Sequence, residues 1–344
     1  MYYMETGSVD PAYNLAFEEY VLTRRLEGNY LMLWQNDRTV VVGRNQNTLE
    51  EINEDFIKSH SIRVVRRTTG GGAVYHDLGN LNYSFITDFR DDADRPIRIF
   101  TDAVVRALRC LGLDAEASGR NDILVSQKKV SGTAQRIEGK RILYHGTLLF
   151  DTDSETIARA LHADPSKFES KSTKSVQSRV GCIRTALLGG PFAGMDIDSF
   201  RQTIREQLAA YCGEETAGLP TDPLTVSILS KEEIREVERL RDEKYNTWDW
   251  TYGRSPRFAF RNRKRFPGGT IEAGVNVAGG LITEIAIHGD FLALQPIEGL
   301  TQHLLGLPYE KSTLEKALSD ISSETDLRLY LGRITADELL SVML

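Results

Sequence analysis

Cysteine is scarce in this sequence, and long apolar runs and a net positive charge are missing from it. The 344 residues include three cysteines, Cys110, Cys182 and Cys212. Three scattered thiols are too few for a disulfide framework or a zinc site, which indicates a reducing compartment. No apolar run approaches the roughly 18 residues that span a bilayer, and the N-terminus lacks the basic and apolar regions of a leader peptide. We therefore expect a cytoplasmic protein without a membrane segment.

The charge balance argues against one class of partner, nucleic acid. The formal net charge is −7, which argues against nucleic acid as the main ligand. The length exceeds the usual single-domain range, and the composition is that of an ordinary globular protein, so two domains are expected.

The first part of the chain mixes helices and short strands. Asp10 and Pro11 predict the start of a helix that continues to about Leu26, and apolar spacing predicts a second helix over Pro96–Leu111. Strands often follow one another without a helix between them, so the sequence predicts an α+β fold with a mixed or antiparallel sheet. The predicted strands are Tyr30–Trp34, Thr39–Val42, Ile62–Arg66, Leu81–Thr87, Asp122–Val125 and Ile142–Phe150.

The polar segment Ser166–Val180 contains almost nothing apolar and predicts a mobile surface loop. Helices are predicted over Asp196–Tyr211, ending near Gly213, and over Ser230–Arg241. A second unit is predicted after Trp248–Trp250, where two β-rich runs flank a glycine pair and two helical stretches follow to Leu344. We expect domains at residues 1–247 and 248–344.

Three consecutive glycines form the most informative segment. Gly70–Gly72 follow the predicted strand that ends at Arg66, with Arg67 just before them and His76-Asp77 shortly after. Such glycines let backbone amides approach a ligand closely, although a glycine triplet alone is often only a tight turn. Neither the P-loop pattern nor the dinucleotide-binding pattern is present.

Three further segments contain candidate functional groups. Lys128–Arg136 places a lysine before Ser-Gly-x-Ala, which could bring an ammonium to an acyl carbonyl and a phosphate, or could be a solvated hairpin tip. Gly119–Asp122 offers a carboxylate for Mg²⁺, or a turn. Tyr144–Leu149 contains His145, whose type of position more often holds a structural histidine.

Together and in this order, these segments resemble the lipoate–protein ligase family. The segment Arg66–Asn80 matches the family pattern closely, as do the lysine, Gly-Arg-Asn-Asp and His-Gly-Thr-Leu-Leu segments and Val41–Asn47. The resemblance is dense over residues 10–185 and weaker beyond, where Trp248–Gly253 and Phe266–Ile271 look like the family's linker and accessory domain.

The resemblance implies a catalytic domain and a smaller α/β accessory domain. It implies an enzyme that uses ATP and Mg²⁺ to convert lipoate to lipoyl-AMP and then transfers the lipoyl group to a lysine of another protein. The implied catalytic residue is Lys129, and Asp122 is the implied metal ligand. The implied lipoate-binding residues are Arg67, Gly71, Gly72, Ala73, His76 and His145. The implied nucleotide-binding residues are Gly72, Val74, Tyr75, Asn121, Asp122, Lys129, Ser175, Val176 and Arg179.

The implied acceptors are apo lipoyl domains of 2-oxo acid dehydrogenase complexes and the glycine-cleavage H protein, and the implied oligomeric state is a monomer. The preferred carrier and the choice between lipoate and octanoate stay open. The nearest alternative is an ATP-independent octanoyl or lipoyl acyltransferase that uses Cys182 as a thioester carrier. A biotin ligase is disfavoured because its glycine loop has another pattern. A lipoyl carrier is disfavoured because the hairpin tip Ala278–Gly280 has no lysine. A lipoate-binding protein without catalytic activity is a further alternative.

Overall fold

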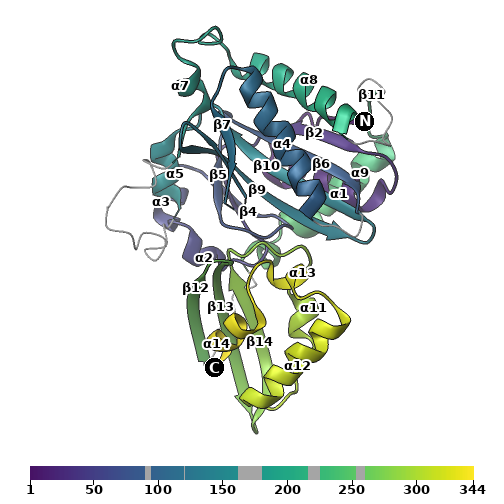
Figure 1. Cartoon of the computed structure of the whole chain (residues 1–344), viewed down its shortest axis with the longest axis vertical. Coiled ribbons are helices and arrows are strands. Elements are labelled where there is room, and N and C mark those ends of the chain that lie inside the picture. Colours follow the sequence, from purple (N-terminus) through teal and green to yellow (C-terminus); the bar gives the residue numbers. More distant parts are fainter. Residues whose placement is uncertain (90–93, 120, 162–179, 216–224, 253–259) are drawn as a thin grey trace.

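Residues 1–89, 94–119, 121–161, 180–215, 225–252 and 260–344 are described by the computed structural model of this chain (Figure 1). The loop predicted at Ser166–Val180 lies outside these residues except for Val180. No helix within the described ranges is long and apolar enough to cross a membrane.

A mixed sheet of eight strands forms the centre of the larger, N-terminal unit. Strand β1 is parallel to both of its neighbours, and the remaining pairs are antiparallel. The predicted α+β fold with a mixed sheet is therefore confirmed. In sheet order the strands are β11 (Thr225–Val226), β1 (Tyr2–Met4), β2 (Tyr30–Trp34), β6 (Asn80–Asp88), β10 (Arg141–Leu149), β9 (Lys128–Glu138), β8 (Asp122–Val125) and β7 (Ala115–Ser118).

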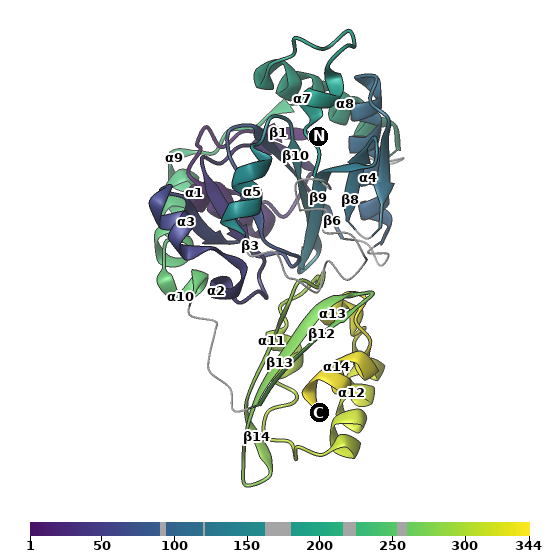
Figure 2. The same cartoon turned by 90° about the vertical axis from the view of Figure 1, so that its left-hand side faces the viewer.

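Alternating side chains bury both faces of this sheet. Leu31 and Tyr83 pack with α4 (Asp94–Cys110) and α8 (Ile197–Glu215). Met32 and Trp34 point to the other face and pack with α1 (Pro11–Arg24) and α9 (Lys231–Leu240). Figure 2 shows these two pairs of helices on opposite sides of the strands. The period of two along each strand thus divides the core into two layers.

A small sheet covers part of the second face. Strand β3 (Thr39–Val42) lies between β4 (Arg63–Arg66) and β5 (Val74–His76). Val41 and Val65 join the apolar cluster next to the large sheet. The opposite face of the small sheet packs with α3 (Glu54–Ser59) and α5 (Ser154–Ala160), and α2 (Thr48–Glu51) follows β3.

Several local predictions agree with the structure, and others do not. Asp10 caps α1 by accepting a hydrogen bond from the Ala12 amide at 3.0 Å, and Ser230 and Glu233 form the predicted capping box. The sequence missed β1, β5, β7 and β11, which are two to four residues long. It also missed the eleven-residue strand β9, whose first part it treated as an extended segment or a hairpin tip. The helix predicted to end near Gly213 continues two residues further, to Glu215, as α8. Short strands carry too little periodic signal to be found.

The C-terminal unit is a three-stranded antiparallel sheet with helices on one face (Figure 1). The predicted hairpin is present as β13 (Gly269–Ala278) and β14 (Leu281–Gly289). The edge strand β12 (Phe260–Phe266) was missed, because four basic residues obscure its alternation. The helices are α11 (Glu298–Thr301), α12 (Lys311–Glu324), α13 (Arg328–Leu331) and α14 (Ala336–Met343).

Arg66, at the end of β4, forms hydrogen bonds to several separate loops. Its buried guanidinium donates to the carbonyl oxygens of Gly43 at 2.9 Å and Gln46 at 2.7 Å. It also donates to the carbonyl oxygen of Thr251 at 2.9 Å, in the short helix α10 (Trp248–Thr251). The segment that precedes the C-terminal unit is therefore held against the N-terminal unit.

Replacing Arg66 with methionine should lower the free energy of unfolding by about 3 kcal/mol or more, because several buried carbonyl groups lose their donor. Urea unfolding measures this change. Arg63→Met is the matched control on the same strand, where an exposed ion pair with Asp10 at 2.7 Å contributes less than about 1 kcal/mol. Equal losses in the two variants would contradict this role of Arg66.

Candidate functional site

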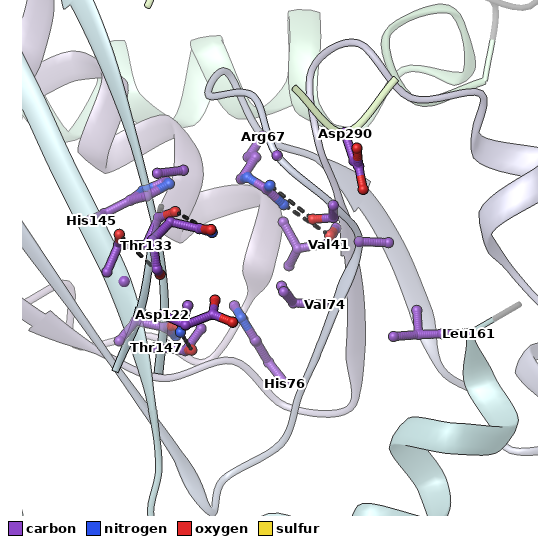
Figure 3. A pocket seen from close by; sticks show the side chains of 18 of the residues that line it. Val41, Arg67, Val74, His76, Asp122, Thr133, His145, Thr147, Leu161 and Asp290 are labelled. Carbon is purple, nitrogen blue, oxygen red and sulfur yellow. Dashed lines mark hydrogen bonds between the residues drawn. The ribbon is translucent and has the colours of Figure 1, made fainter. Parts of the chain in front are cut away.

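A pocket of about 420 Å³ lies between the large sheet and the small sheet. This volume is in the range of sites for small ligands. Figure 3 shows side chains from both sheets and from the C-terminal unit converging on this space. The pocket therefore forms where three parts of the chain meet.

The floor of the pocket is a row of residues across the large sheet. Strand register places Trp34 beside Asn82, Asn82 beside Thr147, Thr147 on the strand next to Gly132, and Gly132 beside Asp122. Residues directly opposite one another on neighbouring strands point to the same face. All five line the pocket. The chain thus brings five distant segments into one row.

The opposite wall includes β5, whose side chains alternate. Val74 and His76 line the pocket, together with Val41 of β3. Tyr75, between them, points to the other face of the small sheet and packs in the cluster with α3 and α5. The side chain of Tyr75 therefore lies away from the pocket to which the sequence assigned it, because a strand turns successive side chains to opposite faces.

The Arg67 guanidinium holds the glycine loop (residues 70–72) from beneath. It is buried, and its Nη2 donates to the carbonyl oxygens of Gly70 at 2.6 Å and Gly72 at 2.9 Å. Burial lowers the pKa of Arg67 to about 10, although the Glu18 carboxylate opposes the shift. The guanidinium is thus still charged at neutral pH, and it fixes the direction in which the loop carbonyls point.

The outer side of the glycine loop contacts the C-terminal unit. The Gly71 amide donates to the Phe291 carbonyl oxygen at 3.2 Å. A Cβ on Gly70 would lie 2.7 Å from the same oxygen, and Gly71 has a φ of +88°, which strains any residue with a side chain. The loop is glycine-rich here because two backbones meet at close range.

Lys129 and Asp122 form the charged end of the pocket. The Lys129 Nζ lies 2.7 Å from Asp122 Oδ1, and both side chains are about one-third exposed. A Cβ on Gly132 would lie 3.2 Å from the Lys129 Nζ, so the missing side chain makes room for the lysine. The Lys-Val-Ser-Gly spacing therefore lets the ammonium lie across its own strand.

His145 connects the pocket to helix α1. Its Nδ1 lies 2.9 Å from Glu18 Oε1, and its Nε2 lies 2.8 Å from Thr69 Oγ1. Glu18 is almost fully buried and also accepts from Ser84 at 2.5 Å. Both ring nitrogens of His145 are thus occupied within the protein, and the ring braces the residue before the glycine loop.

Two charged residues of the pocket belong to the C-terminal unit. Arg265 of β12 and Asp290, just after β14, line the mouth. Asp290 Oδ1 accepts from the Thr270 amide at 2.5 Å. The docked C-terminal unit therefore supplies part of the wall.

Most of the residues proposed from the sequence meet in this pocket. Those that line it are Arg67, Gly71, Gly72, Ala73, Val74, His76, Asn121, Asp122, Lys129 and His145. Ser175, Val176 and Arg179 lie outside the described residues. Five further residues at or next to the pocket were not predicted from the sequence: Glu18, Asn82, Thr147, Arg265 and Asp290. Asn14 and Glu18, one turn apart in an apolar helix, were a signal that could have revealed a buried polar site.

Cys182 lies outside the pocket lining. Its Sγ donates to the Phe150 carbonyl oxygen at 2.8 Å, and it precedes α7 (Ile183–Leu187). Among the residues that the structure describes, no group of three or more histidine, cysteine, aspartate or glutamate side chains could hold a metal ion.

The pocket places a lysine–aspartate pair and a glycine loop beside apolar walls, an arrangement that can hold an acid with an apolar chain next to an anionic group. The family model for the lipoyl protein ligase A/B catalytic domain matches residues 10–209, and that for the bacterial lipoate protein ligase C-terminus matches residues 255–343. The chain is 38% identical to lipoate-protein ligase LplJ of Bacillus subtilis and 39% identical to lipoate–protein ligase 1 of Staphylococcus aureus. Each alignment covers 97% of both chains.

Solved structures agree with these matches. Plasmodium falciparum LipL1 in complex with lipoate has a TM-score of 0.76 at 24% identity over 99% of this chain and 98% of that one, which supports the fold. A lipoate-protein ligase A bound with ATP has a TM-score of 0.62 at 27% identity over 74% and 99%. A bipartite lipoate protein ligase studied with its E2 lipoyl domain, from Thermoplasma acidophilum, has a TM-score of 0.61 at 29% identity over 75% and 98%.

The chain belongs to the lipoate–protein ligase family. It is an ATP-dependent ligase that attaches lipoate to protein, as the sequence predicted.

Proposed function

We propose that this single pocket carries out both half-reactions, with Lys129 as the catalytic residue. The observation that carries the proposal is the continuity of the pocket. It joins the Lys129–Asp122 pair to an apolar region formed by Leu15, Trp34 and Val41. An amphipathic acid such as lipoate needs these two environments side by side.

In the first half-reaction, a carboxylate oxygen of lipoate attacks the α-phosphorus of ATP, and pyrophosphate leaves. Negative charge gathers on the phosphate oxygens and close to the acyl oxygen. The Lys129 ammonium would leave Asp122 and contact both groups, since a fixed cation stabilises the developing charge. The apolar chain of lipoate would lie against Leu15, Trp34 and Val41.

In the second half-reaction, the amine of an acceptor lysine attacks the acyl carbonyl carbon, loses a proton, and displaces AMP. The acceptor supplies the nucleophile, so no cysteine of this chain is required. The Cys182 thioester mechanism lacks support because the Cys182 thiol faces a backbone carbonyl away from the pocket.

The residues at the charged end fit a magnesium ion. Mg²⁺ takes one or two protein carboxylates together with substrate phosphates. Asp122 would hold it, with Asn121 beside it, and both line the pocket. When bound, the ion would neutralise phosphate charge. Asp122 would then bind the ion once Lys129 has moved to the substrate.

The acceptor, the location and the domain limits follow by inference. We infer that the acceptors are apo lipoyl domains of 2-oxo acid dehydrogenase complexes or the glycine-cleavage H protein, that the enzyme is cytoplasmic, and that it acts as a monomer. A relative from Thermoplasma acidophilum was studied with its E2 lipoyl domain. The catalytic and accessory domains are proposed at residues 1–247 and 248–344, although the contacts of α10 favour a boundary a few residues later.

Lys129→Ala should reduce lipoate-dependent ATP–pyrophosphate exchange about 100-fold or more, because the cation that stabilises the developing charge is removed. Its thermal unfolding should change little, since the side chain is partly exposed. Lys128→Ala, the adjacent and more exposed lysine, is the control and should keep near-normal exchange. Near-normal exchange in Lys129→Ala would remove the role proposed for this lysine.

Arg265 is proposed to contact the nucleotide phosphates from the accessory domain. Within the described residues its guanidinium has no carboxylate partner, and its Nη1 donates to Thr270 Oγ1 at 3.3 Å. It therefore brings a cation to the pocket mouth that is available for an anionic ligand.

Arg265→Ala should raise the KM for ATP in the exchange assay about tenfold, the loss of one charge-assisted hydrogen bond. Transfer from isolated lipoyl-AMP to an acceptor should be less affected. Lys264→Ala is the control, because Lys264 points to the opposite face and donates to the Ser341 carbonyl oxygen at 2.6 Å. The same KM in both variants would exclude this phosphate contact.

A further inference from the structure

One ring nitrogen of His76 is a buried polar atom that no described residue pairs with. His76 is 3% exposed and lines the pocket, and its Nε2 has no hydrogen-bond partner among the residues that the structure describes. Buried polar atoms are almost always paired, so an orphaned one at a pocket wall needs a partner that the described residues do not supply. Figure 3 shows the His76 side chain pointing into the pocket.

The protonation of this ring is set by two asparagines behind it. The Asn14 Nδ2 faces the carbonyl oxygens of Ser8 at 3.1 Å and Gln35 at 2.8 Å. Only the nitrogen of the Asn14 amide can face two carbonyl oxygens, because an oxygen there would be repelled. The orientation of Asn14 is therefore fixed by the backbone.

The orientation of Asn14 determines that of Asn36, which in turn contacts His76. The Asn14 Nδ2 lies 2.9 Å from the Asn36 amide, and an amide nitrogen cannot accept a hydrogen bond, so the Asn36 atom that faces it is Oδ1. Asn36 then turns its own Nδ2 to His76 Nδ1, at 3.1 Å. The Nδ1 must then accept, and the ring proton resides on Nε2. Asn36 is fully buried and the Trp34 ring packs edge-on against the imidazole at 6.4 Å. A flip of the ring is thus opposed.

The ring is also neutral. Burial, with the nearby Arg67 and His145, lowers the pKa of His76 to about 3. The pocket wall therefore presents a neutral N–H donor whose lone pair faces Asn36 rather than the ligand.

We propose that Asn14 and Asn36 are positioning residues that hold His76 in the Nε2–H tautomer, and that this N–H donates to an oxygen of the bound acyl adenylate. The proposal rests on the pocket assignment made under Proposed function. The hydrogen bonds that lead from Asn14 through Asn36 to His76, called the relay below, would have two consequences. The N–H binds the substrate oxygen, and the imidazole lone pair, a strong nucleophile and base, is kept away from a reactive anhydride.

The tautomer is observed directly by NMR of the enzyme labelled with nitrogen-15 histidine. The chain has six histidines, and the His76 signals are those that disappear in His76→Gln. We expect a protonated Nε2 and a bare Nδ1 at neutral pH. A proton on Nδ1, or a doubly protonated ring, would contradict the proposed tautomer. This measurement on the wild-type enzyme is decisive by itself and needs no substitution of Asn14 or Asn36.

The donor role is tested by two substitutions at His76. Glutamine places an amide nitrogen near the position of Nε2, whereas methionine has similar bulk and no donor. We expect His76→Met to lower kcat/KM for lipoyl-adenylate formation roughly ten- to hundred-fold, the loss of a hydrogen bond to a charged group. His76→Gln should recover most of it. Equal activity in the two variants would show that the N–H contributes no binding.

Asn36→Asp tests the protection of the anhydride. Its carboxylate can only accept, so in mildly alkaline buffer the ring proton should move to Nδ1 and the Nε2 lone pair should face the pocket. That nitrogen can take a proton from a water molecule whose oxygen attacks the acyl carbonyl carbon, giving lipoate and AMP. We expect release of AMP without acceptor to rise several-fold relative to transfer. An unchanged ratio in a variant whose NMR shows the moved proton would exclude the protective role.

Failure of the pocket assignment is distinguishable from failure of this inference. A wild-type enzyme that forms no lipoyl-AMP would reject the proposed function itself. A wild-type enzyme that forms it, with His76 in the other tautomer, would reject only the relay.

Discussion

The buried charge of Arg67 is the constraint around which this site is built. A guanidinium beneath the glycine loop attracts the carbonyl oxygens of Gly70 and Gly72, and it is surrounded by neutral acceptors. The loop backbone is therefore shaped from inside the protein, by a cation that keeps its charge despite burial. Thr69 and His145 extend this network to Glu18, so the loop, the large sheet and α1 share one set of hydrogen bonds.

The same loop couples the two domains. Its outer side meets the backbone of Phe291, and neighbouring segments add backbone bonds from Gly289 to Asn45 and from Ile137 to Leu294. The C-terminal domain consequently touches the pocket through the loop that forms its wall, and contributes Arg265 and Asp290 to its lining. In this arrangement, a change in the conformation of the glycine loop on ligand binding would directly alter its contact with Phe291 of the docked domain. Residues of both domains thus form the pocket.

Local chemistry in the sequence was sufficient to predict much of the fold and site. The helix cap at Asp10, the close backbone contact at Gly70–Gly72 and the position of Lys129 in the pocket could be predicted, because each depends on residues that are neighbours in the sequence. Asn82, Thr147 and Glu18 were missed, because strand register and helix packing bring them to the pocket from distant segments. Tyr75 was assigned to the pocket as part of a contiguous match, whereas the pleat of β5 turns it away. Spacing alone could not reveal that the accessory domain completes the site.

The central claim is that one pocket holds an acyl adenylate with Lys129 between its carbonyl and its phosphate. A crystal structure with a non-hydrolysable lipoyl-adenylate analogue tests it most directly. The account predicts that the Lys129 Nζ leaves Asp122 and lies within hydrogen-bond distance of both the acyl and the phosphate oxygens, with the apolar chain against Trp34 and Val41. A lysine still paired with Asp122, or pointing into solvent while the analogue occupies the pocket, would contradict it.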